Sequence, residues 1–518
     1  MNNCSPLSLE FGEDVPARVQ ARMDYAFRVF AAIYGHEVVD RKQGSLCCFY
    51  GDCTDRSKSK FLHIPARYVL RESQKAAPAP VASFHAKEEV YLFHGLDHTT
   101  GQPDWLGEIF EWLSAADEMS VRERDAIGRI PYRQSVFAKY GISPLRPQVA
   151  VAMAWFENFI QGQERSETLP AAPSPLPGVK HLVISSHDID FYFAGRWGSL
   201  VRVVKNLGIA VLSARSFPFF RDNFSLLWRM AKGERVGDFL PELLKRSEAE
   251  GFSSTFFVLA RREHRRDANY LPQEISHRLR EIPKSGSSVA LHGSYCSIVE
   301  NSDLDSEVGI LESLMNERPA GSRQHWLRFD DPEKLFANID QAGLQYDSSW
   351  GWADQLGFRN GAAFSFPPYD FTRERAHDFL SIPLIIMDQG LQVARRDSPE
   401  KPGELAETVL EQSRRWGWGG ISVLWHNPVE ALSTSDDVNR IFWQQVEGRA
   451  QHQERWISAE EFLKISLPRY QAAGLLKGLH PYPKAAFRED NQGCHFDAET
   501  TLPELHPGAH NRSAARRR

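Results

Sequence analysis

The chain has 518 residues, of which 42% are hydrophobic and 11% aromatic, and its formal net charge at pH 7 is −6. This length exceeds that of one ordinary domain, so we expect two domains with enough apolar residues for a sizeable core. The acidic balance excludes a general nucleic-acid binder, which needs a basic surface, and 6 cysteines in so long a chain exclude a disulfide framework.

Residues 1–160 predict a smaller mixed α/β domain of unassigned function. Three runs with apolar residues at helical spacing indicate helices, and two β-rich runs indicate strands. The helices are expected at Arg18–Tyr34, Trp105–Ala116 and Pro147–Ile160, and the strands at Phe61–Val69 and Glu89–Phe93. Residues 161–180 are polar and then proline-rich, which is typical of a linker.

A second pattern begins at His181 and continues to about residue 470. Short apolar runs rich in β-formers alternate with helical stretches, which favours a parallel sheet or an incomplete or distorted (β/α) barrel. The strands are expected at His181–Ser186, Ser254–Ala260, Ser288–His292, Gln324–Phe329, Phe379–Met387 and Ile421–His426, and the helices at Trp197–Leu207, Gln273–Ile282, Ser306–Asn316, Pro332–Ala342 and Glu404–Arg415. Residues 479–518 lack periodicity, and we expect a disordered tail there.

The sequence contains no recognisable targeting segment. Its first residues have neither the basic nor the apolar region of a secretory signal. No run approaches the roughly 18 apolar residues that a membrane span needs. We therefore expect a cytoplasmic protein without a transmembrane segment.

Polar residues follow the apolar runs of the second region. Asp188 and Asp190 come after the first run, His292 ends the third, and His426 ends the last. In a (β/α) barrel these positions meet at the rim formed by the carboxyl ends of the strands. Two carboxylates and two imidazoles there predict a divalent metal site with an acid/base pair. The alternative is that the two aspartates cap the helix that starts near Trp197.

From His181 to about residue 470 the chain resembles the polysaccharide deacetylase superfamily, the family-4 carbohydrate esterases, through five motifs in the family's order. The motifs are matched by Asp188 and Asp190, by His292, by Arg323-Gln324-His325-Trp326, by Asp347-Ser348-Ser349-Trp350 and by Leu424-Trp425-His426. The resemblance implies a metal-dependent hydrolase that removes N-acetyl groups from an amino-sugar glycan or glycan precursor. The surrounding segments resemble a subgroup from exopolysaccharide and capsule biosynthesis, in which an N-terminal domain precedes the barrel. This implies a carbohydrate substrate and association with polysaccharide biosynthesis proteins.

The resemblance also implies a role for each matched residue. Asp188 would be the catalytic base, held by Arg323, and His426 the general acid, with Asp347 keeping it cationic. Asp190 and His292 would be metal ligands. The substrate would be contacted by Trp350 and Leu424, which shape a slot for the acetyl methyl group, and by Trp326 and Arg359.

The second motif departs from the family pattern because Gly293 and Cys296 replace two of its residues, including its second histidine. Two ligands would remain, whereas catalytic zinc usually has three from the protein. His325, which stands at a proline position of the third motif, is the best replacement. The alternative is that His325 only packs on Trp326 or forms a local hydrogen bond. Zinc is the expected metal, and cobalt, nickel or manganese stay open.

Two other functions remain open at this point. One is hydrolysis of another non-peptide amide C–N bond, because fold alone does not fix the substrate. The other is a catalytically weak barrel that binds glycan or organises a biosynthetic complex. The lost histidine favours the second alternative, whereas retention of Asp188, Arg323, Asp347 and His426 favours an enzyme.

Overall fold

The computed structural model describes residues 6–40, 46–51, 62–68, 79–85, 88–98, 100–163, 166–193, 196–212, 217–298, 304–397, 401–430 and 435–479. The tail expected at residues 479–518 lies, apart from its first residue, outside these ranges. Within them, no helix is both long enough and apolar enough to cross a membrane.

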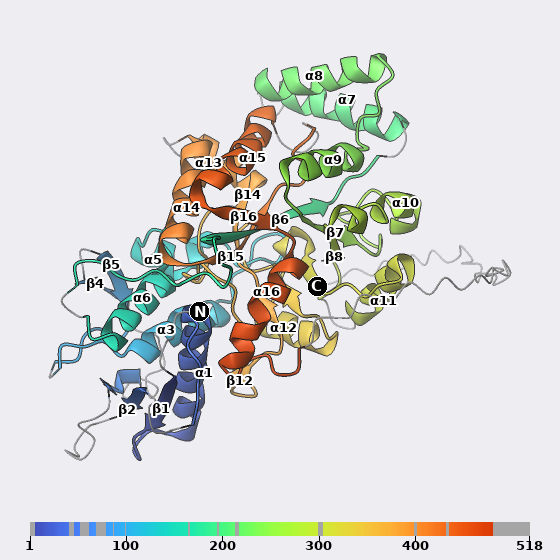
Figure 1. Ribbon diagram of the computed structural model, residues 1–518. Helices are drawn as coiled ribbons and strands as arrows, with labels where there is room; N and C mark the ends of the chain where they lie inside the picture. The colour runs from blue at the N-terminus through green and yellow to red at the C-terminus, as the bar shows by residue number, and fades with distance from the viewer. Residues whose placement is uncertain are drawn as a thin grey trace, which may run out of the picture. The chain divides into compact units, whose positions relative to one another are not determined.

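The N-terminal part combines two small sheets with a group of helices (Figure 1). The strands are β1 (Leu7–Phe11), β2 (Leu46–Tyr50) and β3 (Leu62–Ile64), which are parallel, and β4 (Val81–His85) and β5 (Glu88–Leu92), which form an antiparallel pair. The helices are α1 (Ala17–Tyr34), α3 (Trp105–Ser114), α4 (Ala116–Ser120), α5 (Val136–Tyr140) and α6 (Gln148–Ile160), with a 3-10 turn η2 (Tyr132–Gln134). The three helices and the strand near Glu89 that the sequence predicts are confirmed to within two residues at each end.

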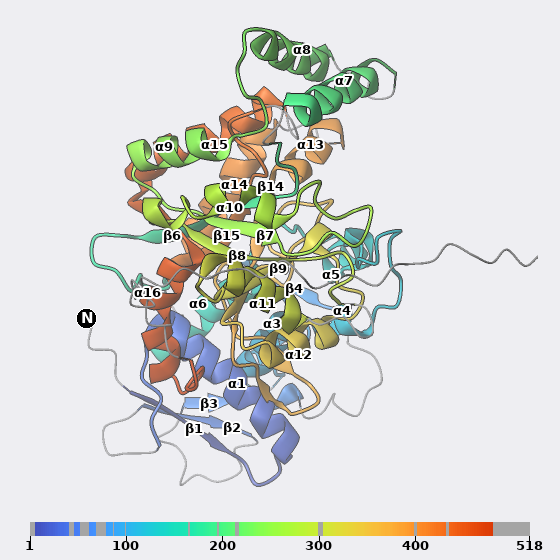
Figure 2. The ribbon, with the colours of Figure 1, turned by 90° about the vertical axis from the view of Figure 1, so that its right-hand side faces the viewer.

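The remaining chain is built on one parallel sheet, whose labelled strands lie side by side near the middle of Figure 2. Its strand order is β13-β10-β9-β8-β7-β6-β15-β14, and β16 also pairs with β6. The strands are β6 (His181–Ile189), β7 (Thr255–Leu259), β8 (Ser288–Gly293), β9 (Gly321–Gln324), β10 (Tyr346–Asp347), β13 (Leu380–Ser381), β14 (Leu384–Met387), β15 (Gly419–Leu424) and β16 (Glu454–Ile457), while β11 (Tyr369–Asp370) and β12 (Arg375–Ala376) form a separate antiparallel pair.

The two ends of this sheet meet within two residues of the chain. β13 is the last strand on one side and β14 the last on the other, and only Ile382 and Pro383 separate them. The Ile382 N–H donates to Asp347 on β10 at 2.8 Å, and the Pro383 carbonyl accepts from Ser422 on β15 at 2.7 Å. The sheet therefore curls on itself, and the predicted distorted (β/α) barrel is confirmed.

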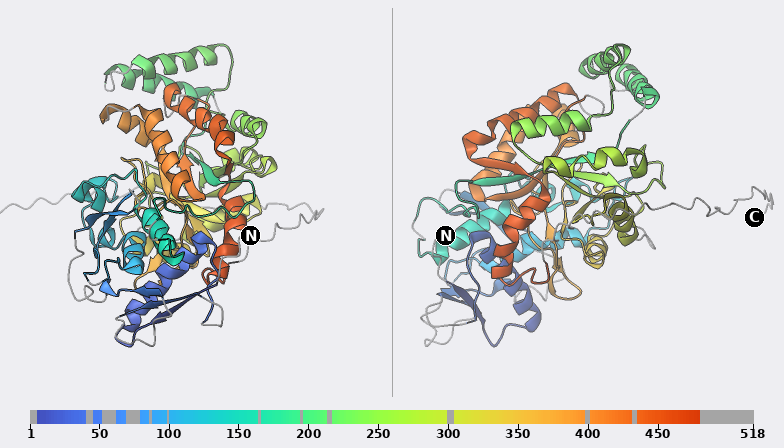
Figure 3. Two further views of the ribbon diagram at one scale, coloured as in Figure 1. Left: turned by 60° about the vertical axis from the view of Figure 1, so that its left-hand side comes forward. Right: turned by 45° about the vertical axis from the view of Figure 1, so that its right-hand side comes forward.

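Helices follow the strands of the curled sheet in the order expected of strand–helix alternation. They are α7 (Arg196–Leu212), α8 (Phe217–Ala231), α9 (Leu240–Glu250), α10 (Ser276–Leu279), α11 (Leu304–Met315), α12 (Pro332–Gln341), α13 (Asp388–Asp397), α14 (Pro402–Trp416), α15 (Asp436–Gly448) and α16 (Ala459–Ala472), with 3-10 turns η3 (Pro272–Ile275), η4 (Pro283–Ser285), η5 (His325–Leu327) and η6 (Arg449–His452). α13, α14 and α15 pack together outside β14 (Figure 1), and α16 reaches α1 (Figure 3).

Two predicted strands differ from the structure for local reasons. The run Gln324–Phe329 is apolar enough to indicate a strand, but β9 ends at Gln324 because Trp326 and Leu327 take positive φ angles of 64° and 50°. The run Phe379–Met387 is divided into β13 and β14 at Pro383, which has no N–H to donate to a ladder. Both breaks lie beside residues of the candidate site.

The N-terminal part and the barrel share one continuous core. The Trp418 indole donates to the carbonyl of Ile33 in α1 at 3.1 Å. The guanidinium of Arg22, which is buried, binds Glu374 beside β12 at 2.8 Å. Contacts of this kind hold α1 against the side of the barrel that carries β11 and β12.

Candidate active site

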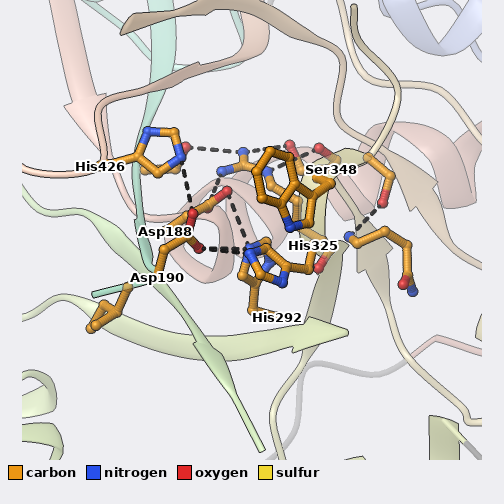
Figure 4. Close-up of polar contacts among 12 residues, drawn as sticks. Asp188, Asp190, His292, His325, Ser348 and His426 are labelled. Carbon is orange, nitrogen blue, oxygen red and sulfur yellow. Dashed lines mark hydrogen bonds and ion pairs between the residues drawn. The ribbon is translucent and has the colours of Figure 1, made fainter. Parts of the chain in front are cut away.

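The polar residues predicted at strand ends converge on one rim of the sheet. Asp188 is the next-to-last residue of β6, and Asp190 directly follows this strand. His292 is in β8, and His426 follows β15. Figure 4 shows these side chains and that of His325 pointing toward one another. The arrangement follows from the parallel pairing, which brings the carboxyl ends of β6, β8, β9 and β15 to the same edge.

Asp190, His292 and His325 form a group that can hold a metal ion. The Asp190 Oδ1 atom lies 3.3 Å from Nε2 of His292 and 3.4 Å from Nε2 of His325, and the three ligand atoms lie within 4.8 Å of one another. Oδ1 of Asp190 is buried and has no hydrogen-bond partner. One carboxylate and two imidazoles are a common ligand set of divalent transition metals.

The tautomer of His292 supports this assignment. Its Nδ1 lies 2.8 Å from the carbonyl oxygen of Arg323, which can only accept, so Nδ1 carries the proton. In the neutral ring, Nε2 then presents a lone pair toward Asp190 and, at 3.6 Å, toward Asp188. A lone pair and a carboxylate at these distances are held together by a proton or by a metal cation, so the residues fit a metal ion.

The charges around Asp190 agree with this conclusion. Burial opposes the charge on the carboxyl, but the imidazoles of His325, His292 and His426 outweigh it and hold the pKa of Asp190 well below its usual range. The side chain therefore stays a carboxylate at neutral pH, as a metal ligand must.

His325 reaches the site through an unusual turn. Burial opposes its protonation, but the carboxylates of Asp190 and Asp267 raise the pKa of His325 to about 9. Its Nδ1 lies 4.0 Å from Asp267, while the ring centroid of Trp326 is 5.7 Å away. The positive φ of Trp326 ends β9 and leaves His325 facing the rim. The imidazole thus points toward Asp190 as well as packing near Trp326.

The departure in the second motif has a steric cause. A side chain at Gly293 would collide with the side-chain amide of Gln324, which accepts a hydrogen bond from Ser297 at 2.6 Å. Cys296, at the position of the family's second histidine, is half-buried and is not among the group around Asp190. His325 lies where a third ligand is needed.

Asp188 is fixed by a buried arginine. Arg323 is fully buried and donates from one terminal nitrogen to Oδ1 of Asp188 at 2.7 Å. Its other terminal nitrogen donates at 2.9 Å to the hydroxyls of Ser186, Ser348 and Ser422. The guanidinium thus compensates the charge of Asp188 and leaves Oδ2 facing the group around Asp190.

Asp347 has a different partner from the one expected. It accepts hydrogen bonds from the Ser322 hydroxyl at 3.0 Å and from Ser349, whose hydroxyl also accepts from the Gln324 N–H at 2.9 Å. Burial raises the pKa of Asp347 to about 6. The prediction that Asp347 keeps His426 cationic is therefore corrected: Asp347 braces the end of β9, next to His325.

The partner of His426 is Asp388, which sequence reasoning missed. Asp388 is fully buried at the start of α13, and its Oδ1 accepts from Nδ1 of His426 at 2.8 Å. The Nε2 atom of His426 lies 3.5 Å from Oδ2 of Asp190. Burial opposes protonation of His426, but the carboxylates of Asp388, Asp190 and Asp188 raise its pKa to about 10. Asp388 directly follows β14, so the same strand-end rule could have found it.

A small apolar cluster contains two leucines that are close in sequence to His325 and His426. Leu327 lies two residues after His325, and Leu424 two residues before His426. These leucines form a buried cluster with Leu384 and Met387, separate from the main core. Leu424 ends β15, two residues before His426, and its contact with the acetyl methyl group stays a prediction.

The expected contact of Trp350 with the acetyl methyl group stays a prediction. The Trp350 side chain is buried and packs against Phe329 at 5.6 Å and Phe336 at 5.7 Å. Arg359, an expected substrate contact, is also buried, and it binds Glu118 of the N-terminal part at 2.8 Å. The role of Arg359 is therefore corrected to holding the N-terminal part against the barrel. Trp326 is 38% exposed next to His325 and can contact a ligand.

A pocket opens beside these groups. It is lined by the site residues Asp188, Asp190 and His426 and by Phe191, Phe193, Arg202 and Asn427. Arg202 comes from α7 and stacks on Phe191 at 4.3 Å. Asp188, Asp190 and His426 thus line one solvent-connected pocket.

Comparison with known proteins gives only distant structural likenesses. No family model and no curated protein matches the chain. A Mycobacterium smegmatis chain assigned as a polysaccharide deacetylase matches with a TM-score of 0.35 and 16% identity, covering 59% of this chain and 96% of that one.

Two further structures match over similar spans. Puue allantoinase has a TM-score of 0.34 and 13% identity over 60% of this chain and 95% of its own. A family 4 carbohydrate esterase from Streptomyces lividans, solved with acetate, has a TM-score of 0.27 and 12% identity over 54% and 92%. The likenesses are too remote to assign an activity, so function has to follow from the geometry of the site.

Proposed function

We propose that this protein is a metal-dependent hydrolase that removes N-acetyl groups from an amino-sugar glycan or glycan precursor during polysaccharide biosynthesis. The proposal rests on the positions of a carboxylate and an imidazole, each paired with a buried residue of opposite charge, around one candidate metal site. Asp188, held by Arg323, and His426, held by Asp388, both face Asp190. A base and an acid on either side of the reacting bond are what amide hydrolysis needs.

The metal site would be formed by Asp190, His292 and His325. A divalent ion held there, zinc by preference and cobalt, nickel or manganese as alternatives, supplies Lewis acidity that polarises the acyl carbonyl. Asp190 contributes the negative charge, and the Nδ1 proton of His292 is fixed by the Arg323 carbonyl, which keeps Nε2 available.

Asp188 would accept the proton of the attacking water. Arg323 occupies Oδ1, so Oδ2 is the atom that takes the proton as the oxygen–carbon bond forms. His426 would donate the proton on Nε2 to the amide nitrogen as the carbon–nitrogen bond breaks, giving acetate and a free amine. A histidine with a pKa of about 10 is protonated at neutral pH, and an amine leaves readily only when it receives a proton.

The apolar cluster favours a small acyl group. Leu327 and Leu424 belong to one buried cluster and are each two residues from a histidine of the site, and we propose that they receive the acetyl methyl. The half-exposed indole of Trp326 would stack on a sugar ring, as aromatic faces commonly do.

Metal content and acetate release test the proposal together. Purified wild-type protein should hold one divalent ion and release acetate from N-acetylated glycans, and Asp188→Asn should keep the ion while losing about 10²–10⁴-fold in rate. His426→Ala should lose more on an N-acetyl amide than on an activated aryl acetate, which leaves without a proton. His452→Ala is the control, because this exposed histidine precedes β16, whose first residue pairs with the start of β6 at the end of the sheet opposite the rim. Equal losses of His426→Ala on amide and ester would show that this histidine is not the acid.

The same panel separates the remaining alternatives. A hydrolase of non-sugar amides would release acid from simple N-acyl amines and leave every glycan intact. A glycan-binding scaffold would bind glycan and release no acetate at any metal loading. Both outcomes contradict the proposal.

A further inference from the structure

The helices α7 and α8 form a hairpin that stands out from the barrel (Figures 1 and 2). Val203 of α7 packs against Leu226 of α8 and against Val236, which follows α8, in a small core of their own. Three partly buried residues, Leu207, Leu227 and Met230, complete this core. The hairpin is therefore held together by its inner faces, and its outer faces are available to solvent.

The outer face of α7 is apolar. Trp197 is 79% exposed and Leu212 83%, and between them lie Val201, Val204 and Val211, which are also exposed. Residues at these spacings fall on one stripe of a helix. The opposite stripe, with Ser199, Val203, Asn206 and Ala210, is buried. An amphipathic helix normally turns its apolar stripe inward, so the outward stripe needs an explanation.

The outer face of α8 repeats the pattern. Phe217 is 75% exposed, and Phe224 and Trp228 are each more than half exposed at positions seven and eleven residues further along. Of the fourteen large hydrophobic side chains that are exposed among the described residues, nine belong to these two helices. Such a concentration on one protruding element marks an interaction surface.

The positive charge of the hairpin indicates that this surface binds an anionic partner. Residues 196–235 contain eight arginines and lysines against two acidic residues, a formal charge of +6, whereas the whole chain has −6. Lys205 and Lys232 lie within this segment, and Nζ of Lys232 lies 3.3 Å from the ring centroid of Trp228. Like charge opposes the packing of a second hairpin of the same kind, whereas tryptophan beside basic residues is typical of a membrane interface.

We propose that the α7–α8 hairpin docks the protein on the surface of an anionic lipid bilayer. The exposed tryptophans, phenylalanines and valines enter the boundary between headgroups and acyl chains, and the exposed Lys205 and Lys232 contact the anionic headgroups. With 17 and 15 residues, the helices are shorter than the roughly 20 residues that span a bilayer, so the hairpin lies in the interface. The proposal does not depend on the proposed activity.

Vesicle flotation of the full chain tests it. The wild type should float with vesicles of phosphatidylcholine containing about one-third phosphatidylglycerol, and float little with phosphatidylcholine alone. Each basic residue near an anionic surface is worth about fivefold in binding, so Lys205→Gln with Lys232→Gln should weaken binding about 25-fold. Trp197→Ser with Trp228→Ser should weaken it at least about tenfold and abolish the blue shift of tryptophan fluorescence on binding.

Matched variants keep the test specific. Val81→Ser with Leu271→Ser removes exposed apolar side chains outside the hairpin and should leave binding unchanged. The proposal is overturned if the wild type binds both kinds of vesicle equally weakly, or if this control loses as much binding as the tryptophan variant. It is also overturned if the protein dimerises in solution and the tryptophan variant is monomeric, because the hairpin would then receive a second copy. The lysine variant stays informative even if loss of both tryptophans impairs folding.

Discussion

The change Asp388→Asn measures how firmly the protein holds His426 as an acid. The fully buried Asp388 carboxylate accepts from Nδ1 of His426 at 2.8 Å, from the His426 backbone N–H at 3.1 Å and from the Gln389 N–H at 2.7 Å. An asparagine has the same shape but only one accepting oxygen. A hydrogen bond to a charged group contributes about 1.5–3 kcal/mol. At about 1.36 kcal/mol per pKa unit, the pKa of His426 should fall from about 10 by about one to two units.

The expected kinetic effect follows from the sign of this shift. The acid must be protonated, so activity that depends on His426 is present below its pKa and is lost as pH rises through it. The basic limb of the kcat profile on an N-acetylated oligosaccharide should therefore move to lower pH by about one to two units. Between the new limb and the old one, where His426 of the variant has lost its proton and that of the wild type has not, the loss should approach a factor of about 10–10².

The measurement is kcat against pH for an amide and for an activated ester, with metal content and melting temperature recorded for each sample. Asp436→Asn, the same change at the exposed first residue of α15, is the control and should leave both profiles unchanged. If Asp388→Asn keeps its metal and its melting temperature and its basic limb does not move, then Asp388 does not support the acid and the reasoning is wrong.

The third ligand can be tested by His325→Ala. Loss of a group that only hydrogen-bonds to a metal ligand costs roughly 10–100-fold in metal affinity, and loss of a ligand should cost more. If a chelator competition gives unchanged affinity, His325 only packs in the core. Because the pKa of His325 without metal is about 9, a proton must leave before the ring binds an ion, so affinity should fall about tenfold per pH unit below about 9. Calorimetry in buffers of different ionisation heat should show about one proton released, and no release would contradict the ligand role. Gly419→Ala should destabilise the fold by about 2–5 kcal/mol, because φ is +88° and a Cβ would collide with the Leu182 carbonyl. Gly448→Ala, with open space around it, should change the urea midpoint little.

Strand ends were the most informative feature of the sequence. Polar residues that follow buried parallel strands share one rim. From the sequence alone, this rule predicts that Asp188, Asp190, His292 and His426 lie together. It works because parallel pairing brings the carboxyl ends of neighbouring strands to one edge. Asp388 obeys the same rule but is also the first residue of a helix, where an acidic side chain is ordinary.

Other features depend on long-range contacts that local patterns do not contain. Arg359 stands in a turn-like segment, yet it is buried because Glu118, 241 residues earlier, meets it across the interface between the N-terminal part and the barrel. Asp267 reaches His325 from a loop whose sequence reads as charged surface. The apolar spacing of Trp197–Leu207 predicts a helix equally well whether its apolar stripe is covered or exposed.

The central strand of the barrel also governs when the protein can fold. β6 pairs with β7 along its second half, but Leu182 pairs with Gly419 of β15 and with Arg455 of β16 near the end of the described chain. During synthesis, the apolar first half of β6 therefore has unpaired backbone groups until more than 200 further residues have been made. Strands with unpaired edges are prone to aggregate. Asp188 and His426 come together only when β15 docks, so an incomplete chain released from the ribosome has no active site.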